Sequence, residues 1–208
     1  SELFLDLGYF TAITMCYFLV EGYRYTHSKK KYARRLFIFA LISEIPFSLA
    51  FTEEGVLEFH GLNMIFTLLI CFGILVVVER VGNKILRFVC ILGLIIPSLI
   101  SDWALLAPVF TLLFIWSYGS KVKTKYAFII SMILFGMLEF LARVNILPVK
   151  ENLIFSLGSM VGILLAGISI IYLYNGKRMD RGREFSKWFF YIFYPGHLLI
   201  LGLIRLFI

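Results

Sequence analysis

The 208-residue sequence predicts an all-α protein, a single domain over residues 1–208 built from about eight helices that each cross a lipid bilayer. Hydrophobic residues make up 61% of the chain and charged residues 16%, whereas a soluble domain carries about a quarter charged residues. The apolar residues occur in long runs that short charged clusters separate. This pattern is typical of a polytopic bundle of membrane-spanning helices.

Eight apolar runs follow one another along the chain. They cover approximately residues 3–20, 33–52, 62–79, 85–100, 103–118, 126–142, 153–174 and 187–208. Several are shorter than the ~20 residues of a perpendicular crossing, so their limits are set only to within a few positions. The first run has no positive segment before it and no cleavage site, so we do not interpret it as a signal peptide. The chain starts at Ser1 without Met, and we expect a ninth helix upstream in the intact protein.

Lysine and arginine predict the orientation of these helices. Most of the 20 basic residues lie in four alternate turns, at 21–35, 80–87, 121–125 and 177–187. The opposite turns and ends keep only Arg143, Lys150 and Arg205. The positive-inside rule then predicts a multi-pass protein of the plasma or bacterial inner membrane, with membrane lipids around it and its basic loops in the cytoplasm. We do not interpret the net charge of +7 as a sign of a nucleic-acid partner, because no stacking or recognition-helix motif accompanies it.

Cysteine and histidine give no sign of a metal site. Cys16, Cys71 and Cys90 fall within apolar runs without paired spacing, so we interpret them as small core residues. His27 and His60 have no partners at ligand spacing.

Glu44 lies in the sequence Ser-Glu-Ile-Pro within the second run. An ionisable residue at membrane depth costs about 2.5–3.5 kcal/mol and therefore calls for a partner or a function. Pro46 frees a backbone carbonyl next to this acid and kinks the helix. A functional carboxylate is the favoured interpretation, and a paired or neutral Glu that locks two helices together is the alternative.

Other polar residues accompany Glu44 in the apolar runs. Asn63 and Thr67 are four residues apart, on one face of the third helix near the outer end where Glu44 could meet them. A hydrogen-bonded bridge between helices explains them equally well. His197 follows Tyr194-Pro195-Gly196, where the last helix is expected to open. It suits a general base, or it caps the kinked helix.

Two acidic residues lie at the ends of runs. Asp102 belongs to a tight Ser-Asp-Trp turn on the outer side, where capping the next helix is the simplest role. Glu21 ends the first run just before Gly22, and we expect it to pair with Arg34 or Arg35.

Together these residues resemble the TraX family. The resemblance is carried by Phe-Leu-Val-Glu-Gly-Tyr (18–23), Thr26, Lys-Lys-Tyr-Ala-Arg-Arg-Leu (30–36), Ile-Phe-Ala-Leu-Ile-Ser-Glu-Ile-Pro-Phe (38–47), Asn-Met-Ile-Phe-Thr-Leu-Leu (63–69) and Tyr-Ile-Phe-Tyr-Pro-Gly-His-Leu (191–198). The activity named for that family is N-acetylation of the pilin subunit of conjugative plasmids. The chain is also distantly similar to integral-membrane acyltransferases that use cytoplasmic acyl-CoA.

The resemblance implies an acetyltransferase with acetyl-CoA as donor. Arg forks on the cytoplasmic face suit the phosphates of coenzyme A. The residues expected to bind it are Glu21, Lys31, Arg34 and Arg35. His197 or Glu44 would act as the proton acceptor. The acceptor molecule, a peptide amine, a glycan hydroxyl or a small amine, would be bound by Asn63, Thr67, Asp102 and Tyr194.

The chain departs from the family pattern at its start. Family members begin with another helix that carries an Asp-His pair, and their Gly-Arg-Ile-Ala-Phe-Pro is here Gly8-Tyr9-Phe10-Thr11-Ala12-Ile13. Their Asp-Tyr-Gly turn is here Asp102-Trp103-Ala104. A small polytopic transporter or a non-catalytic membrane scaffold is the alternative function, since kinked helices with polar residues also serve transport.

Overall fold

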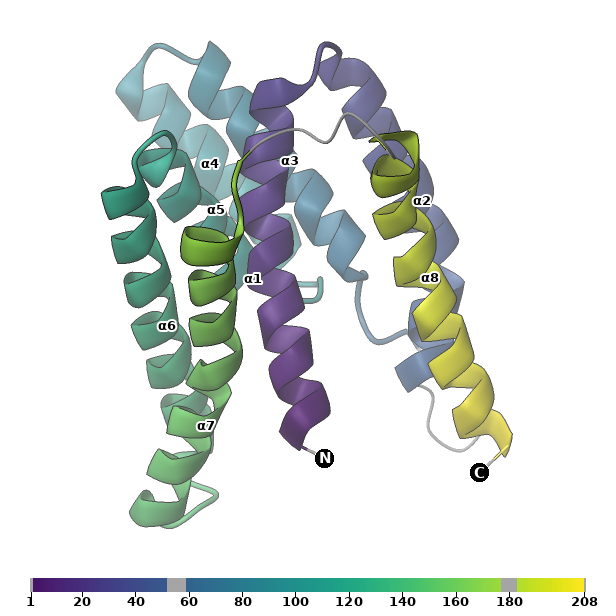
Figure 1. Cartoon of the computed structure of the whole chain (residues 1–208), viewed down its shortest axis with the longest axis vertical. Helices are drawn as coiled ribbons and strands as arrows, with labels where there is room; N and C mark the ends of the chain where they lie inside the picture. Colours follow the sequence, from purple (N-terminus) through teal and green to yellow (C-terminus); the bar gives the residue numbers. More distant parts are fainter. Residues whose placement is uncertain (1, 52–58, 177–182, 208) are drawn as a thin grey trace.

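The computed structural model describes the backbone of residues 2–51, 59–176 and 183–207, and these ranges contain eight α-helices and no strand (Figure 1). The helices are α1 (Glu2–Tyr25), α2 (Lys29–Phe51), α3 (Met64–Arg80), α4 (Lys84–Ser98), α5 (Leu106–Ser117), α6 (Lys121–Arg143), α7 (Val149–Ile168) and α8 (Arg183–Phe207). A π-helical turn, η1 (Ser169–Leu173), extends α7. Each predicted apolar run corresponds to one helix, so the all-α class is confirmed.

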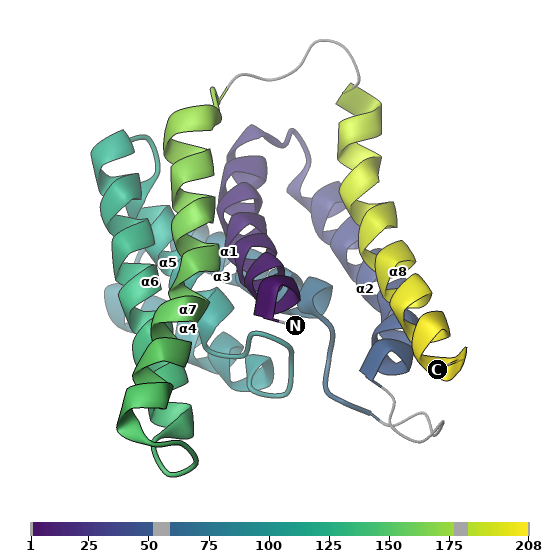
Figure 2. The same ribbon diagram turned by 60° about the horizontal axis from the view of Figure 1, so that its bottom comes forward.

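Helix α1 forms the centre of the larger part of the bundle. It packs against α3, α5 and α7, while α6 closes this group by packing on α5 and α7. Buried side chains from these helices, among them Ile13, Phe110, Phe114 and Ile163, form the core. Helices α2 and α8 lie side by side at one edge and join the rest through the contact of α2 with α3 (Figure 2).

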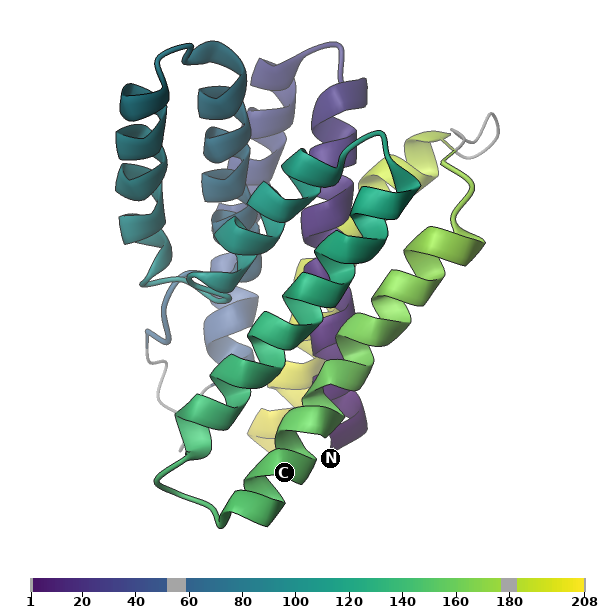
Figure 3. The same ribbon diagram turned by 90° about the vertical axis from the view of Figure 1, so that its left-hand side faces the viewer.

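Three charged connections lie at the same end of the bundle. The helices alternate in direction, so the turns after α1, α3 and α5 meet at one end (Figure 3). This end carries basic side chains from each turn, including Arg24, Lys29, Arg80, Lys84 and Lys121. The basic clusters that alternate along the sequence thus lie together at one end of the described structure.

Small residues set the distance between two of the helix pairs. A Cβ atom on Gly202 of α8 would lie 2.8 Å from Cγ of Leu49 on α2 and 3.0 Å from its carbonyl carbon. A Cβ atom on Gly167 of α7 would lie 3.2 Å from Cβ of Phe128 on α6. Glycines of this kind let helices approach closely, as they do in membrane bundles.

Length and composition qualify two of the described helices to cross a membrane. They are Lys121–Arg143 and Val149–Leu173, the latter combining α7 with η1. Helix α5 and the segment Trp188–Ile204 of α8 are apolar but shorter. Helix α2 continues through Pro46 and α8 through Pro195, so the predicted opening of the last helix is wrong.

Candidate functional site

An extended segment before α3 builds the frame of the site. The N–H of Leu62 donates to the carbonyl of Ile100 (2.8 Å), and the N–H of Asp102 donates to the carbonyl of Leu62 (2.7 Å). Gly61 precedes this pairing with φ +96°, and a Cβ atom on it would lie 2.8 Å from the carbonyl oxygen of Ile100. Glycine is therefore required where the chain joins the start of α3 to the turn after α4.

Asn63 connects this segment to α2. Its side chain is fully buried and caps α3, since Oδ1 accepts from the N–H of Ile65 (3.0 Å). Its Nδ2 donates to the carbonyl of Ala40 (2.8 Å) and to Oε2 of Glu44 (2.6 Å). The predicted meeting of Asn63 with Glu44 is confirmed. Asn63, however, is the residue before α3 and has an extended backbone, rather than lying inside the helix.

Glu44 is held by one of its two carboxylate oxygens. The backbone N–H of Asn63 adds a second, longer bond to Oε2 (3.4 Å), so this oxygen faces the start of α3. The positive end of the helix dipole lies there and stabilises the negative charge. Oε1 is buried and has no hydrogen-bond partner among the described residues. The carboxylate is thus fixed in place with one oxygen left to accept a hydrogen bond or a proton.

Helix α8 brings Tyr194 and His197 to the same region. The N–H of Met64, in the first turn of α3, donates to Oη of Tyr194 (3.1 Å), and this phenol can still donate its own proton. The ring of His197 meets that of Tyr194 edge-on, with centroids 5.5 Å apart. Nδ1 of His197 lies 3.0 Å from the carbonyl oxygen of Phe193. Because a carbonyl only accepts, Nδ1 carries the proton and Nε2 is the basic nitrogen.

Thr67 and Asp102 form the next layer, one turn along α3. Oγ1 of Thr67 donates to the carbonyl oxygen of Asp102 (2.5 Å) and lies 3.1 Å from Oγ of Ser101. The expected capping role of Asp102 is wrong, because the N-cap of α5 is Leu105, which makes no side-chain bond. Burial raises the pKa of Asp102 to about 6, although a hydrogen bond from the backbone of Trp103 opposes the shift.

Trp103 follows Asp102 in a left-handed conformation, with φ 57°. For a non-glycine residue this conformation costs about 1–3 kcal/mol and persists only when the surroundings fix it. Here the indole packs against Phe135, with stacked rings 5.6 Å apart, and edge-on against Tyr9. The sequence marked this turn but gave no sign of its strained backbone.

The basic group expected to bind a cofactor lies near the first turns of α2. Lys31 and Arg34 are exposed, whereas the guanidinium of Arg35 sits between the rings of Tyr32 (5.4 Å) and Tyr191 (6.0 Å). Nε of Arg35 is buried and has no hydrogen-bond partner among the described residues. The contact with Tyr191 joins α2 to α8 and could not be read from the sequence.

Glu21 does not pair with Arg34 or Arg35, so that prediction is wrong. Its Oε2 accepts from the phenol of Tyr174 (2.7 Å), because α1 packs along α7 and Tyr174 follows η1, which extends α7. A cluster at the same end of the bundle was not predicted from the sequence. In it, the carboxylate of Glu79 accepts hydrogen bonds from the ammonium of Lys29 and from the phenol of Tyr23.

The candidate site therefore has two parts. Arg35 and Glu44 lie nine residues apart on α2, a rise of about 13 Å along the helix. No group of His, Cys, Asp or Glu suited to a metal ion is found in the described residues. The fold and site define an all-helical bundle with two membrane-length helices, a basic end, and a buried carboxylate–amide pair at the start of α3.

The chain belongs to the TraX family: the family model described as TraX protein matches residues 3–205. It is also 28% identical over 209 residues to the probable fimbrial assembly protein FimC, serogroup H1, of Dichelobacter nodosus. That alignment covers 97% of this chain and 82% of the relative. No solved structure matches the chain.

Proposed function

We propose that this chain is a multi-pass membrane acyltransferase that transfers an acetyl group from acetyl-CoA to an amine. The observation that carries the proposal is the arrangement on α2, where the basic pair Arg34 and Arg35 lies near one end and Glu44, with one free oxygen, lies farther along. Family membership supports the same reading.

The surface of the bundle supports eight membrane crossings with the basic end in the cytoplasm. Large apolar side chains are exposed on helices across the structure, for example Ile85 (77% exposed), Leu173 (78%) and Ile45 (70%). Apolar surface on this scale is unfavourable in water and is satisfied by hydrocarbon. The positive-inside rule then assigns the end with Lys29 and Lys121 to the cytoplasm.

The basic end fits the donor. Arg34 and Lys31 are exposed. Nε of Arg35 is a buried donor without a hydrogen-bond partner in the part of the chain that the structure describes, so it calls for an acceptor. Guanidinium groups bind phosphate oxygens by paired hydrogen bonds. Glu21, bonded to Tyr174, would position the neighbouring end of α1 rather than touch the phosphates. Bound acetyl-CoA would supply the acetyl group as a thioester: the carbon–sulfur bond would break as the amide bond forms, and coenzyme A would leave as the free thiol.

The residues at the start of α3 would then prepare the acceptor amine. Oε1 of Glu44 takes the proton that the amine loses, and Nε2 of His197 is the second candidate for this role. Asn63 fixes the carboxylate through its bond to Oε2. The phenol of Tyr194 donates to the acceptor and orients it.

Asp102 and Thr67 would bind the acceptor from the turn after α4. The buried carboxylate of Asp102 suits a cationic amine, while Thr67 holds the turn in place through the carbonyl oxygen of Asp102. The name of the relative refers to fimbrial assembly. We therefore favour an amine on a fimbrial or pilus subunit as the acceptor, over a glycan hydroxyl or a small amine.

Binding of the donor is tested with purified protein and labelled acetyl-CoA. Arg34→Ala and Arg35→Ala should weaken binding, each by at least about a factor of ten, because a hydrogen bond to a charged group contributes about 1.5–3 kcal/mol. Lys123→Ala and Lys125→Ala, on the same end of the bundle but on α6, are the matched controls and should bind as the parent does. Absent binding at millimolar acetyl-CoA, or equal losses in both pairs, would refute the donor site.

Transfer is tested with Glu44→Gln, which keeps the shape of the side chain and removes its basicity. Acetylation of the acceptor should fall by about 10²–10⁴-fold, the usual range for loss of a general base, while acetyl-CoA binding stays. Glu151→Gln, an exposed substitution on α7, is the control. If Glu44→Gln transfers acetyl groups at the parental rate, Glu44 is not the proton acceptor and His197→Gln becomes the decisive variant.

A further inference from the structure

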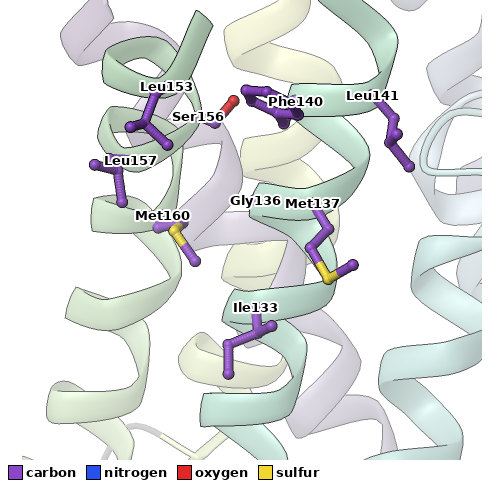
Figure 4. Close-up of a pocket in the computed structure, with 9 residues that line it drawn as sticks. All are labelled: Ile133, Gly136, Met137, Phe140, Leu141, Leu153, Ser156, Leu157 and Met160. Atoms are coloured by element: carbon purple, nitrogen blue, oxygen red, sulfur yellow. The ribbon is translucent and has the colours of Figure 1, made fainter. Parts of the chain in front are cut away.

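An apolar groove runs between α6 and α7, away from the candidate site. It has a volume of about 330 Å³, at the lower end of the range of small-molecule pockets. Figure 4 shows side chains of both helices along it, with Ile133 and Phe140 on α6 and Leu153 and Met160 on α7. Its one polar side chain, Ser156, already donates to the carbonyl of Asn152 (2.8 Å). A ligand in this groove is therefore held by apolar contact alone.

Glycine creates the floor of the groove. A Cβ atom on Gly136 would lie 2.8 Å from Sδ of Met160, so the Met160 side chain lies directly over this glycine and would have to move if the position carried a side chain. The rim is open to the outside of the bundle, where Leu141 is 60% exposed and Leu157 56% exposed. These two helices are also the ones that are long and apolar enough to cross a membrane. The groove thus faces hydrocarbon if the proposed membrane placement is correct.

A cation continues the groove at the end where α6 turns into α7. Lys150 lies three residues before Leu153 and seven before Leu157, so it stands on the side of α7 that lines the groove. It has no ion-pair partner among the described residues. Arg143, at the end of α6, is instead paired with Glu139. Among the described residues where α6 turns into α7, Lys150 is therefore the cation without an ion-pair partner.

We propose that this groove binds one acyl chain of an anionic phospholipid from the surrounding bilayer, with the lipid phosphate against Lys150. The inference rests on the membrane placement in the proposed function and is independent of the acetyl transfer. A lysine near the headgroup level attracts an anionic headgroup. The apolar groove accommodates the chain below it. A peptide helix from a partner would not require a cation at this position.

The test is native mass spectrometry of the detergent-solubilised protein, titrated with phosphatidylglycerol and with phosphatidylcholine of the same chain length. The parent should bind phosphatidylglycerol more tightly. Lys150→Gln should lower the affinity for phosphatidylglycerol about fivefold and leave that for phosphatidylcholine unchanged. Lys123→Gln, on α6 at the basic end, is the charge-matched control. Equal affinities for the two lipids in the parent would overturn the headgroup assignment.

The groove itself is tested by filling it. Leu157→Trp should abolish the bound lipid, whereas Ile154→Trp, on an exposed neighbouring face of α7 outside the groove, should keep it. If the Leu157→Trp variant binds lipid as the parent does, the inference is refuted. It is also refuted if the parent has the mass of a dimer and Leu157→Trp has the mass of a monomer, because a second copy of the chain would then occupy the groove. Acetyl-CoA binding is measured on the same samples. A parent protein that binds acetyl-CoA but does not prefer phosphatidylglycerol would refute this inference alone. A parent protein that prefers phosphatidylglycerol but does not bind acetyl-CoA would refute the acyltransferase alone.

Discussion

Replacing Asn63 with alanine removes three hydrogen bonds at one buried point. The helix cap on Ile65 contributes about 1 kcal/mol. The carbonyl of Ala40 and Oε2 of Glu44 would each lose a donor in a buried place, at a cost of about 1–3 kcal/mol per group. We therefore expect Asn63→Ala to lower the free energy of unfolding by about 3 kcal/mol or more.

Asn83→Ala is the matched control for this substitution. Asn83 caps α4 through Oδ1, which accepts from the N–H groups of Ile85 and Leu86, but its side chain is exposed and makes no other contact of this kind. Its loss should cost about 1 kcal/mol. The two variants should thus differ by at least about 2 kcal/mol.

The assay is thermal unfolding in detergent, followed by intrinsic fluorescence. A domain of this size loses roughly 2–4 °C of Tm per kcal/mol, so Asn63→Ala should melt at least about 4 °C below Asn83→Ala. Asn63→Asp separates the contributions further, because it keeps the cap acceptor, loses both Nδ2 donors and places a second carboxylate beside Glu44. It should be no more stable than Asn63→Ala at neutral pH. Equal melting temperatures for Asn63→Ala and Asn83→Ala would show that the bonds to Glu44 and Ala40 contribute nothing.

Three further predictions concern the turn at Asp102, the segment before α3 and the packing of α8 on α2. The pKa of Asp102 is raised to about 6 from its ordinary value near 4, so the folded state binds the proton more tightly than the unfolded state does. The free energy of unfolding should therefore fall as the pH rises from about 4 to about 6. Asp102→Asn should remove this pH dependence when unfolding is measured from pH 4 to 7. Gly61→Ala should lower the free energy of unfolding by about 1–3 kcal/mol, because Gly61 has a positive φ and the carbonyl oxygen of Ile100 would lie 2.8 Å from the new Cβ. Gly82 has open space around it, so Gly82→Ala should have the Tm of the parent. Gly202→Ala should separate α8 from α2 and lower Tm, while Gly196→Ala on the same helix should not; equal Tm values for the two would contradict the close approach.

The local elements of this fold could be predicted because hydropathy is a local property of the sequence. Each apolar run corresponds to one helix, and the alternation of charge placed the basic connections at one end. The meeting of Glu44 with Asn63 was also predictable, since Glu44 lies in the second half of α2 and Asn63 directly precedes α3, the next helix in the sequence. Contacts between helices that follow one another in the sequence can be deduced from the order of the helices.

Contacts between helices far apart in the sequence could not be deduced. Glu21 was expected to meet the arginines of the next helix, but its partner is Tyr174, 153 residues away, because α1 packs on α7. The bond from the N–H of Met64 to Tyr194 spans 130 residues and depends on where α8 docks. The sequence supplied the polar residues of the site, and the packing of α8 on α2 decided which of them meet.

That packing has a consequence for the proposed chemistry. Helices α2 and α8 run side by side in the same direction, and Arg35 contacts Tyr191 of α8 across the pair. Tyr194 lies about one turn farther along α8 and reaches the start of α3, where Glu44 is bound. One helix pair therefore sets both the position of the basic group and that of the carboxylate. A substitution that shifts α8 along α2 should impair donor binding and acetyl transfer together, whereas a change confined to α6 or α7 should leave both intact.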